Sequence, residues 1–489
     1  MSRLPSDKPE NGDSCRGILK EFLNRRFRDK PTRLTGADCF VLTLETLMRR
    51  HGQHGLIGQT HLRMDSVPDL AGLEKSAERL AQAHPLLNAK TWRNPFNLLP
   101  AWHSKKRGPR SLPVNLWFEK GACIPDGRHA TEILSEGEWV EHVLNQPLGF
   151  RDGLRNLHID LLLLRTGGSL LVLTWTHLLF DGKGAEFLVD ALVNPPSPEA
   201  KAVAPTSAPA LKHPLWRLRD LLREATPVVE RFSLLTKNRY SSLGGPRPRP
   251  GRLRFQMLTF DRESTSRIQA RLEATVGPLF SIGFYLACAL RAHRAVFLSR
   301  GEDPEHYVVS IPVQVRKKGR GGTPFQNCVT ILFFALKRES LGSIESAAAC
   351  AQQQFEEMTR ARLDRSFTAV LELMSVIPSA LYLWFLSAQF GGEITSFFHS
   401  FTGDFSARLG SVFGASVTNA YHIPSVSAPP GSGLFFGLFN GQLNATFSWR
   451  EGSVTSAEAD SVLATLRGDL LGQDALNPPQ TEFTECVPT

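Results

Sequence analysis

The sequence contains few cysteines, and their spacing excludes the usual cysteine-based sites. Seven cysteines are scattered over 489 residues, and no two of them follow the CxxC spacing of zinc modules. An odd, scattered set does not make a disulfide framework either, so we expect reduced thiols in a cytoplasmic protein. The first residues, MSRLPSDKPENGDSCRG, contain no apolar run. We therefore expect no secretory signal.

Long hydrophobic runs are also scarce. The one stretch that approaches the length of a membrane span, MSVIPSALYLWFLSAQF at 374–390, is interrupted by Pro378 and by several polar residues. It predicts either a buried helix or a helix that lies on a lipid surface, with Tyr382 and Trp384 at the interface. Hydrophobic residues make up 42% of the chain and charged residues 21%. These values exclude a wholly disordered chain and are typical of globular proteins.

Acidic residues are outnumbered by basic ones. The chain has 56 Lys and Arg against 47 Asp and Glu, a formal charge of +9. Two basic clusters, Lys105–Arg107 and Arg316–Arg320, predict either solvated charge or contacts with the phosphates of CoA or with an acidic carrier protein. Neither cluster is interleaved with aromatic residues and no nucleic-acid module is recognisable, so we expect no binding to nucleic acid.

Strands and helices alternate in both halves of the chain, which predicts a two-lobed α/β or α+β protein. The length corresponds to about three domains. We divide it into a flexible lead-in (1–30), an N-terminal lobe (31–192), a proline-rich linker or crossover (193–250), a C-terminal lobe (251–472) and a tail (473–489).

Several elements carry clear local signals. Apolar spacing predicts a helix over 70–83, and Thr455 with Glu458 forms a capping box for the last helix. Asn440-Gly441 is a preferred hairpin turn. The other predicted elements are a hairpin at 158–165 and 169–177, a helix pair at 264–274 and 280–297, strands at 307–316, 327–336 and 414–423, and helices at 343–363 and 374–390.

The segment THLLFDGKGAE, residues 176–186, is the strongest candidate for a chemical function. His177 ends a predicted buried strand, and a helix begins soon after Asp181-Gly182. A neutral imidazole presented into a cleft can remove a proton from a hydroxyl or amine. A glycine at 182 permits a close approach of the backbone. The alternative is a solvated or packed histidine followed by an ordinary Asp-Gly turn, and His84 and His422 are interpreted in that way.

The order of motifs resembles that of a known family. These motifs are the H-x-x-x-D-G of 177–182, PTRLTGADCFVL, AERLAQAHPLLNAK, SIPVQVRKKG with the later Asn327, SVTNAYHIP and LNATFSWREGSVT. Together they resemble the chloramphenicol acetyltransferase-like superfamily, which includes wax ester synthase/diacylglycerol acyltransferases, polyketide-associated acyltransferases and condensation domains of nonribosomal peptide synthetases. The resemblance covers most of residues 31–472.

The resemblance implies two similar lobes, each a mixed sheet with helices, and a tunnel between them. It makes His177 the catalytic base and Asp181 a structural aspartate, with Arg316 or Arg165 as its partner. The first histidine of the family's H-H-x-x-x-D-G signature is Thr176 here. By the same resemblance, Thr418 and Asn419 line the tunnel and bond the substrate carbonyl or oxyanion, with Thr176 as a further tunnel candidate. The alternative for Thr418 and Asn419 is that they are polar residues satisfying a strand edge.

The resemblance predicts an acyltransferase. It would move an acyl group from a CoA or carrier-protein thioester to a hydroxyl or amine acceptor, with no metal and no tightly bound cofactor. The thioester, as acyl-CoA or acyl-phosphopantetheine, is then a co-substrate, and we expect a cytoplasmic monomer that contacts at most the membrane surface. The Asn-Asp pair and Asn-Val-Pro-Gly run of wax ester synthases are missing. Together with Thr176, this leaves a second hypothesis open: a catalytically silent binding or scaffold protein for an acyl carrier or lipid.

Overall fold

The computed structural model describes residues 32–473 apart from short internal segments. These segments are 94–97, 104–110, 125–128, 134, 150–154, 195–213, 236–239, 248–249, 279, 317–324, 390–391 and 407–408. The predicted lead-in, most of the predicted tail, part of the predicted linker and the basic cluster Lys105–Arg107 lie outside the described residues.

The first large sheet has seven strands in the order β13-β14-β2-β8-β7-β5-β6. Its strands are β2 (Ile57–Met64), β5 (Val114–Glu119), β6 (Thr131–Ile133), β7 (Leu157–Leu163), β8 (Ser169–Thr176), β13 (Ser411–Val412) and β14 (Ala415–Pro424). The predicted hairpin is confirmed as β7 and β8, and every residue of β8 is buried. A strand buried on both faces needs apolar residues at consecutive positions, as SLLVLTWT has.

Helices cover both faces of this sheet. Residues of α2 (Gly36–Arg50), α3 (Leu70–Ala83) and α5 (Gly182–Val193) pack on one face. Helix α4 (Glu136–Leu144) packs on the other, where it meets residues of the second sheet. The predicted helix over 70–83 is confirmed, and its apolar residues Leu73, Ala77 and Leu80 are buried. The amphipathic spacing therefore sets the face that α3 presents to the sheet.

The second large sheet has six strands in the order β11-β10-β12-β15-β16-β9. They are β9 (Leu253–Phe260), β10 (His306–Gln314), β11 (Val329–Lys337), β12 (Phe397–Asp404), β15 (Ser432–Phe439) and β16 (Gln442–Arg450). The pairs β10–β12 and β12–β15 are parallel and the others antiparallel, so this sheet is mixed, as predicted. Asn440 and Gly441, both with positive φ, form the predicted turn between β15 and β16.

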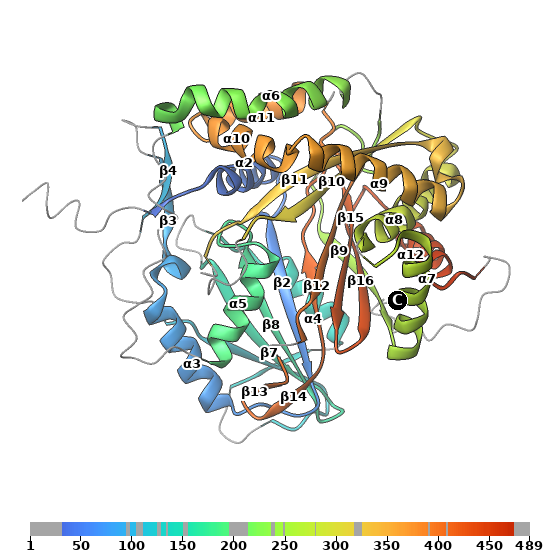
Figure 1. Cartoon of the computed structure of the whole chain (residues 1–489). Coiled ribbons are helices and arrows are strands. Elements are labelled where there is room, and N and C mark those ends of the chain that lie inside the picture. The colour runs from blue at the N-terminus through green and yellow to red at the C-terminus, as the bar shows by residue number, and fades with distance from the viewer. Residues whose placement is uncertain are drawn as a thin grey trace, which may run out of the picture.

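Helices α7 (Arg262–Val276), α8 (Ser281–Ser299), α9 (Ile344–Arg360) and α12 (Ser456–Leu471) pack on this second sheet. The predicted capping box of Thr455 and Glu458 begins α12. A small third sheet, β1-β4-β3, comprises β1 (Thr32–Arg33), β3 (Lys90–Arg93) and β4 (Pro100–His103). Figure 1 shows α6 (Leu218–Leu235), α10 (Leu363–Met374), α11 (Ser379–Gln389) and α2 grouped at one end of the molecule.

The two large sheets are tied together by an exchanged strand. Strand β14 follows β12 in the chain but pairs antiparallel with β2 of the first sheet, from Val417↔Met64 to Pro424↔Gly58. The chain then returns to the second sheet as β15. The lobe boundaries drawn from the sequence remain a prediction. They assign β14 to the C-terminal lobe, although it pairs with β2 in the sheet of the N-terminal lobe. Such pairing between distant segments is invisible to local sequence patterns.

Two predicted helices have different bounds in the structure. The helix predicted over 343–363 ends at Arg360, because Arg362 adopts a left-handed conformation (φ 52°) and α10 begins at Leu363. In the apolar 374–390 stretch, Met374 ends α10 and a separate helix, α11, runs from Ser379 to Gln389. No single described helix is long and apolar enough to cross a membrane, and the pair α7 and α8, which reaches that length together, bends by 102° at its break.

Four of the buried histidines among the described residues have strongly lowered pKa values. Burial lowers the pKa of His61 and of His399 to about 3, and that of His293 and of His422 to about 4. Burial disfavours the charged imidazolium, so the folded protein keeps these rings neutral. The unfolded chain protonates them near pH 6.5.

We predict that the protein loses stability as the pH falls below about 6.5, because only the unfolded chain then binds protons at these rings. Above that pH these histidines are neutral in both states and contribute nothing to the pH dependence. Each ring with a folded pKa near 3 costs about 2 kcal/mol of the free energy of unfolding at pH 5. Urea unfolding at pH 7 and pH 5 measures this loss.

The variant His399→Leu isolates one ring. The difference in stability between pH 7 and pH 5 shrinks by about 2 kcal/mol relative to wild type. His103→Leu, at an exposed histidine, leaves the difference unchanged. An equal pH dependence in wild type and His399→Leu contradicts the assignment.

Candidate active site

His177 lies between the end of β8 and the start of α5. Its backbone N–H donates to the carbonyl of Leu56 at 2.8 Å, and its own carbonyl accepts from Asn327 Nδ2 at 3.0 Å. The residue is partly exposed, whereas its Nδ1 is buried without a hydrogen-bond partner among the described residues. The backbone is thus held on both sides while the imidazole stays available.

Asp181 is the N-cap of α5 and accepts three hydrogen bonds. Oδ1 accepts from the backbone N–H of Gly184 at 2.8 Å and from Arg316 Nη1 at 2.6 Å, and Oδ2 accepts from the N–H of Cys328 at 2.9 Å. The first bond satisfies a free donor at the helix start. The other two reach the segment between β10 and β11, so Asp181 joins the two lobes.

Arg316 is the partner of Asp181, and the structure decides between the two arginines proposed from the sequence. The side chains of Arg316 and Asp181 are only 12% and 5% exposed. Arg316 also donates to the carbonyl of Gln326 at 2.8 Å, and its guanidinium lies 5.6 Å from the centre of the Phe187 ring. Arg165 is exposed. Arg316 is therefore occupied inside the protein, and residues 317–320 of its cluster lie outside the described residues.

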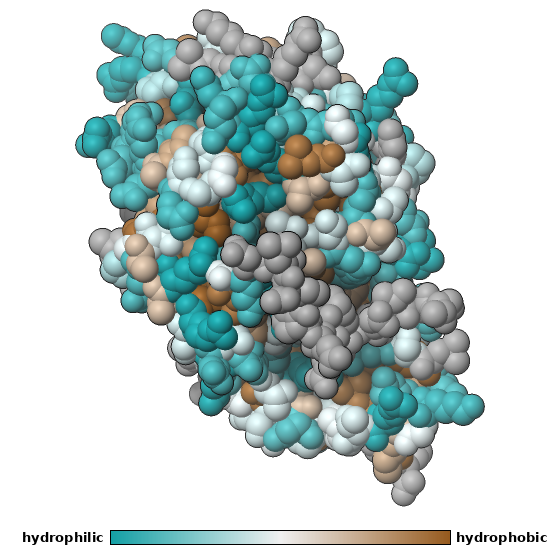
Figure 2. Space-filling model, turned by 90° about the vertical axis from the view of Figure 1, so that its right-hand side faces the viewer, coloured by the Kyte–Doolittle hydropathy of each residue, from teal (hydrophilic) through white to brown (hydrophobic). Residues whose placement is uncertain are grey.

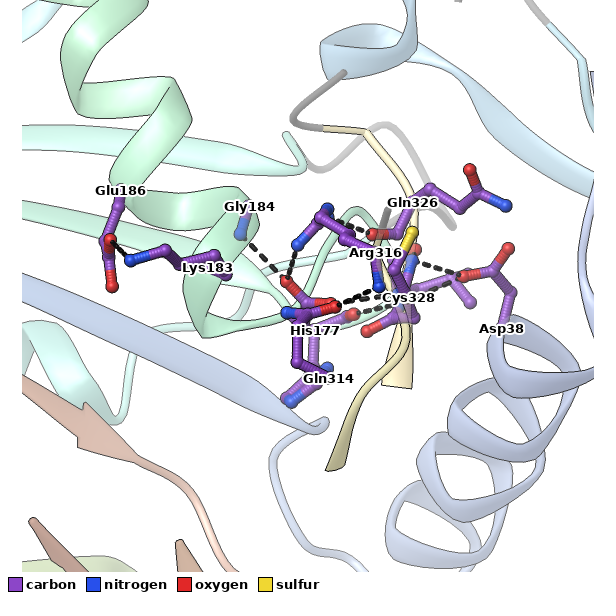
Figure 3. A network of polar contacts seen from close by, with 12 residues as sticks. Asp38, His177, Lys183, Gly184, Glu186, Gln314, Arg316, Gln326 and Cys328 are labelled. Carbon is purple, nitrogen blue, oxygen red and sulfur yellow. Dashed lines mark hydrogen bonds and ion pairs between the residues drawn. The ribbon is translucent and has the colours of Figure 1, made fainter. Parts of the chain in front are cut away.

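Asp38 completes the network, although the sequence analysis did not single it out. Oδ1 of Asp38 accepts from the backbone N–H of Asn327 at 3.1 Å and from its Nδ2 at 2.9 Å. Asp38 is also the N3 residue of the capping box of α2, with Thr35 as N-cap. The Thr-x-x-Asp spacing of a capping box was the sequence signal that could have pointed to Asp38. Figure 3 shows Asp38 reaching from α2 towards the strand segment that carries Cys328, with His177 on the other side.

Burial governs the charge state of the site. It lowers the pKa of His177 below its usual value, although the nearby carbonyl of His177, the Asp181 carboxylate and Asn327 act in the opposite direction. Burial also raises the pKa of Asp38, against its hydrogen bonds from Thr35 and Asn327. A neutral imidazole at cellular pH is the form that can accept a proton.

Gly182 faces the second lobe. A Cβ atom at this position would lie 3.6 Å from Cγ2 of Thr402 on β12, an ordinary van der Waals distance. An alanine would therefore fit, and a longer side chain would reach into the space between the lobes.

The structure does not bring Thr418 and Asn419 to His177. They lie on β14 opposite Arg63, whereas His177 bonds to Leu56 at the other end of β2. Seven residues of strand separate the two places, roughly 20 Å. Asn419 exchanges side-chain amide hydrogen bonds of 3.0 Å with Asn444, and Thr418 Oγ1 donates to the carbonyl of Arg63 at 3.2 Å.

Thr176 precedes His177 and is fully buried in β8. Its Oγ1 has no hydrogen-bond partner among the described residues. Thr176 is the last residue of the strand, and His177 begins the turn that leads to α5.

A small cavity lies between the two large sheets. It is lined by residues of β12, β14, β15 and β16, including Thr402, Tyr421, His422 and Asn444, and has a volume of about 10 Å³. That is room for one water molecule. His422, interpreted from the sequence as a packing or surface residue, borders this cavity: its Nδ1 lies 3.0 Å from Thr60 Oγ1, and its Nε2 is buried without a partner among the described residues.

Within the described part of the chain, no group of three His, Cys, Asp or Glu side chains gathers as a metal site. The side chains that meet around His177 are instead hydrogen-bond donors and acceptors for one another. Lys183, next to Gly182, pairs with the buried carboxylate of Glu186 (Figure 3).

Solved structures with this architecture were found by comparison. The first condensation domain of the calcium-dependent antibiotic synthetase matches with a TM-score of 0.66 at 16% identity, over 92% of this chain and 98% of that one. A trichothecene 15-O-acetyltransferase from Fusarium sporotrichioides matches with a TM-score of 0.63 at 16% identity, over 90% and 95%. Polyketide synthase associated protein 5 from Mycobacterium tuberculosis gives 0.55 at 14%, over 90% and 98%.

These likenesses extend over nearly the whole of each chain. The protein therefore has the two-lobed fold of condensation domains and related acyltransferases, and the predicted fold class is confirmed. No protein-family model matches the sequence, and neither does any curated protein.

We predict that Asp181→Ala lowers the free energy of unfolding by about 3–5 kcal/mol, because it leaves the buried Arg316 charge without its partner. Urea unfolding at pH 7 measures the loss. In the double variant Asp181→Ala/Arg316→Ala the loss is smaller than the sum of the two single losses.

The exposed pair of Arg360 and Glu356, with an N–O distance of 3.2 Å and side chains 78% and 49% exposed, provides the control. Glu356→Ala changes stability by less than about 1 kcal/mol. Similar losses in Asp181→Ala and Glu356→Ala would show that the inter-lobe ion pair has no special role in stability.

Proposed function

We propose that this chain, which has the fold of condensation domains and acyltransferases, is itself an acyltransferase. It moves an acyl group from a CoA or carrier-protein thioester to a hydroxyl or amine, with His177 as general base. The observation that carries the proposal is the His177 site at the junction of the lobes. The residue is partly exposed, burial keeps its imidazole neutral, and Leu56 and Asn327 fix its backbone.

The proposed reaction needs one proton carrier. The imidazole of His177 takes the proton of the acceptor O–H or N–H while that oxygen or nitrogen attacks the thioester carbonyl carbon. The tetrahedral intermediate then collapses, the C–S bond breaks, and the imidazolium returns the proton to the departing thiolate. No covalent acyl-enzyme is formed, and the products are an ester or amide and a free thiol.

Three residues position the base without touching the substrate. Asp181 and Arg316 hold the start of α5 against the segment before β11, and Asn327, itself held by Asp38, bonds the carbonyl of His177. Fixing the base before the substrate arrives lowers the entropic cost of reaching the transition state. Thr418 and Asn419 are left out of the proposed mechanism because of their distance from His177.

The class of substrate is proposed from the neighbours' names. Among them are an O-acetyltransferase, a polyketide synthase associated protein and condensation domains of peptide synthetases. This range supports acyl transfer and leaves both donors, acyl-CoA and carrier-bound phosphopantetheine, as candidates. A cytoplasmic location and a monomeric state remain predictions from the sequence.

Two observations favour a second candidate function, a binding protein without turnover. Thr176 replaces the first histidine of the H-H-x-x-x-D-G signature, and the cavity between the sheets has room for only one water molecule. An acyl chain would need the side chains around this cavity to move. A protein of this kind would bind an acyl carrier or a lipid and release no thiol.

We predict that wild type releases free thiol from an acyl-CoA donor when an alcohol or amine acceptor is added, and that His177→Ala lowers this rate by about 100-fold or more. A thiol-reactive chromophore follows the release with a panel of donors and acceptors. His103→Ala, at an exposed histidine that also ends a strand, retains the wild-type rate.

The thermal midpoint of His177→Ala stays close to that of wild type if the residue serves catalysis rather than folding. Equal rates in wild type and His177→Ala would overturn the assignment of the base. If neither CoA nor carrier-protein donors release thiol in wild type, the binding-protein function is supported instead.

A further inference from the structure

Helix α6 carries two apolar stripes, and only one of them is buried. Leu221, Ala225 and Val228 are buried, and the first two pack on Ala369 of α10. The second stripe follows helical spacing at Leu218, Leu222 and Val229 of α6 and continues to Leu215 in the turn before it, and these side chains are 40–59% exposed. Trp216, just before α6, is 80% exposed. A surface helix normally needs only the first stripe.

Helix α11 shows the same excess of apolar surface. Its sequence, SALYLWFLSAQ, contains no charged residue. Tyr382 and Leu383 are buried on the side where α11 packs on α2, while Leu381, Trp384 and Phe385 are 50%, 61% and 46% exposed. Among the described side chains of α11, one leucine and two aromatic residues are therefore exposed.

The two exposed faces lie at the same end of the molecule, where α2, α6, α10 and α11 group together (Figure 1). We call Trp216, Leu218, Leu222, Leu381, Trp384 and Phe385 the α6–α11 surface. On the side of the molecule that Figure 2 shows, hydrophobic residues form small spots separated by hydrophilic ones. Exposed apolar side chains that gather at one end of a molecule mark a contact surface.

Positive charge next to this surface favours a negatively charged partner. Arg217 and Arg219 are exposed beside Trp216 and Leu218, and residues 214–219 contain no carboxylate. The nearest acidic residue, Asp220, forms an ion pair with Arg223 at 3.7 Å. The whole chain carries +9. Tryptophan, leucine and arginine at the edge of an amphipathic helix are the composition of helices that lie in the headgroup region of a bilayer.

We propose that the α6–α11 surface docks on an anionic phospholipid bilayer. The indole and aliphatic side chains enter the interface, and Arg217 and Arg219 lie at the level of the lipid phosphates. None of these residues belongs to the Asp181–Arg316 network, and the proposal does not rest on the proposed acyl transfer. In this proposal, the exposed face of the apolar stretch at 374–390 lies on the lipid, and its other face is buried against α2.

Vesicle co-sedimentation tests the proposal with phosphatidylcholine vesicles that either contain or lack phosphatidylglycerol. Wild type binds the phosphatidylglycerol vesicles more tightly, and added salt weakens that binding. Trp216→Ser/Trp384→Ser weakens binding to both kinds of vesicle by about tenfold or more. Arg217→Gln/Arg219→Gln weakens binding only where phosphatidylglycerol is present, by roughly fivefold or more.

Leu298→Ser provides the matched control, because Leu298 is 52% exposed on α8, away from this surface. It leaves vesicle binding unchanged, and circular dichroism checks the fold of every variant. The proposal is overturned if wild type binds neither vesicle, or if the double tryptophan variant binds as wild type does. It is equally overturned if sedimentation shows a dimer that Trp216→Ser/Trp384→Ser separates while vesicle binding is absent, because a second copy then covers the surface.

Discussion

The buried ion pair of Asp181 and Arg316 is the interaction on which the candidate site depends. It joins the N-terminus of α5 in the first lobe to the segment before β11 in the second, and both side chains are almost fully removed from water. Two charges in such a place are costly unless each is paired and hydrogen-bonded. Asp181 meets that condition with two backbone N–H donors besides Arg316. The pair therefore fixes where α5 begins and, through the short turn before it, where His177 lies.

A second set of polar contacts supports the same turn from the other side. Asp38 holds Asn327, and Asn327 holds the carbonyl of His177. The side chains in this chain of contacts come from α2, from the turn after β8 and from the start of β11, which are far apart in sequence. Burial of His177 itself lowers its pKa and keeps the imidazole neutral. The hydrogen bonds thus set the position of His177, and its burial between the packed lobes sets its protonation state.

The exchanged strand β14 ties the two lobes together. It belongs to the second half by sequence and to the first sheet by its hydrogen bonds. Its side chains face the small cavity between the sheets, with His422 among them. A cavity of this size admits a single water molecule. The two candidate functions, acyltransferase and binding protein, share this fold. They differ in whether the space between the sheets has room for a substrate.

Much of the fold and part of the site follow from local sequence patterns. The buried hairpin, α3, the Asn440-Gly441 turn and the cap of α12 are decided by residues within one or two turns of each other, where periodicity and capping act. The H-x-x-x-D-G segment and its resemblance to a known family indicated His177 and Asp181 in the same way. Tertiary structure alone decided that Arg316 rather than Arg165 pairs with Asp181, and that Asp38 holds Asn327. It also placed Thr418 and Asn419 at the far end of β14, because strand register and long-range pairing join segments whose spacing in the chain carries no signal.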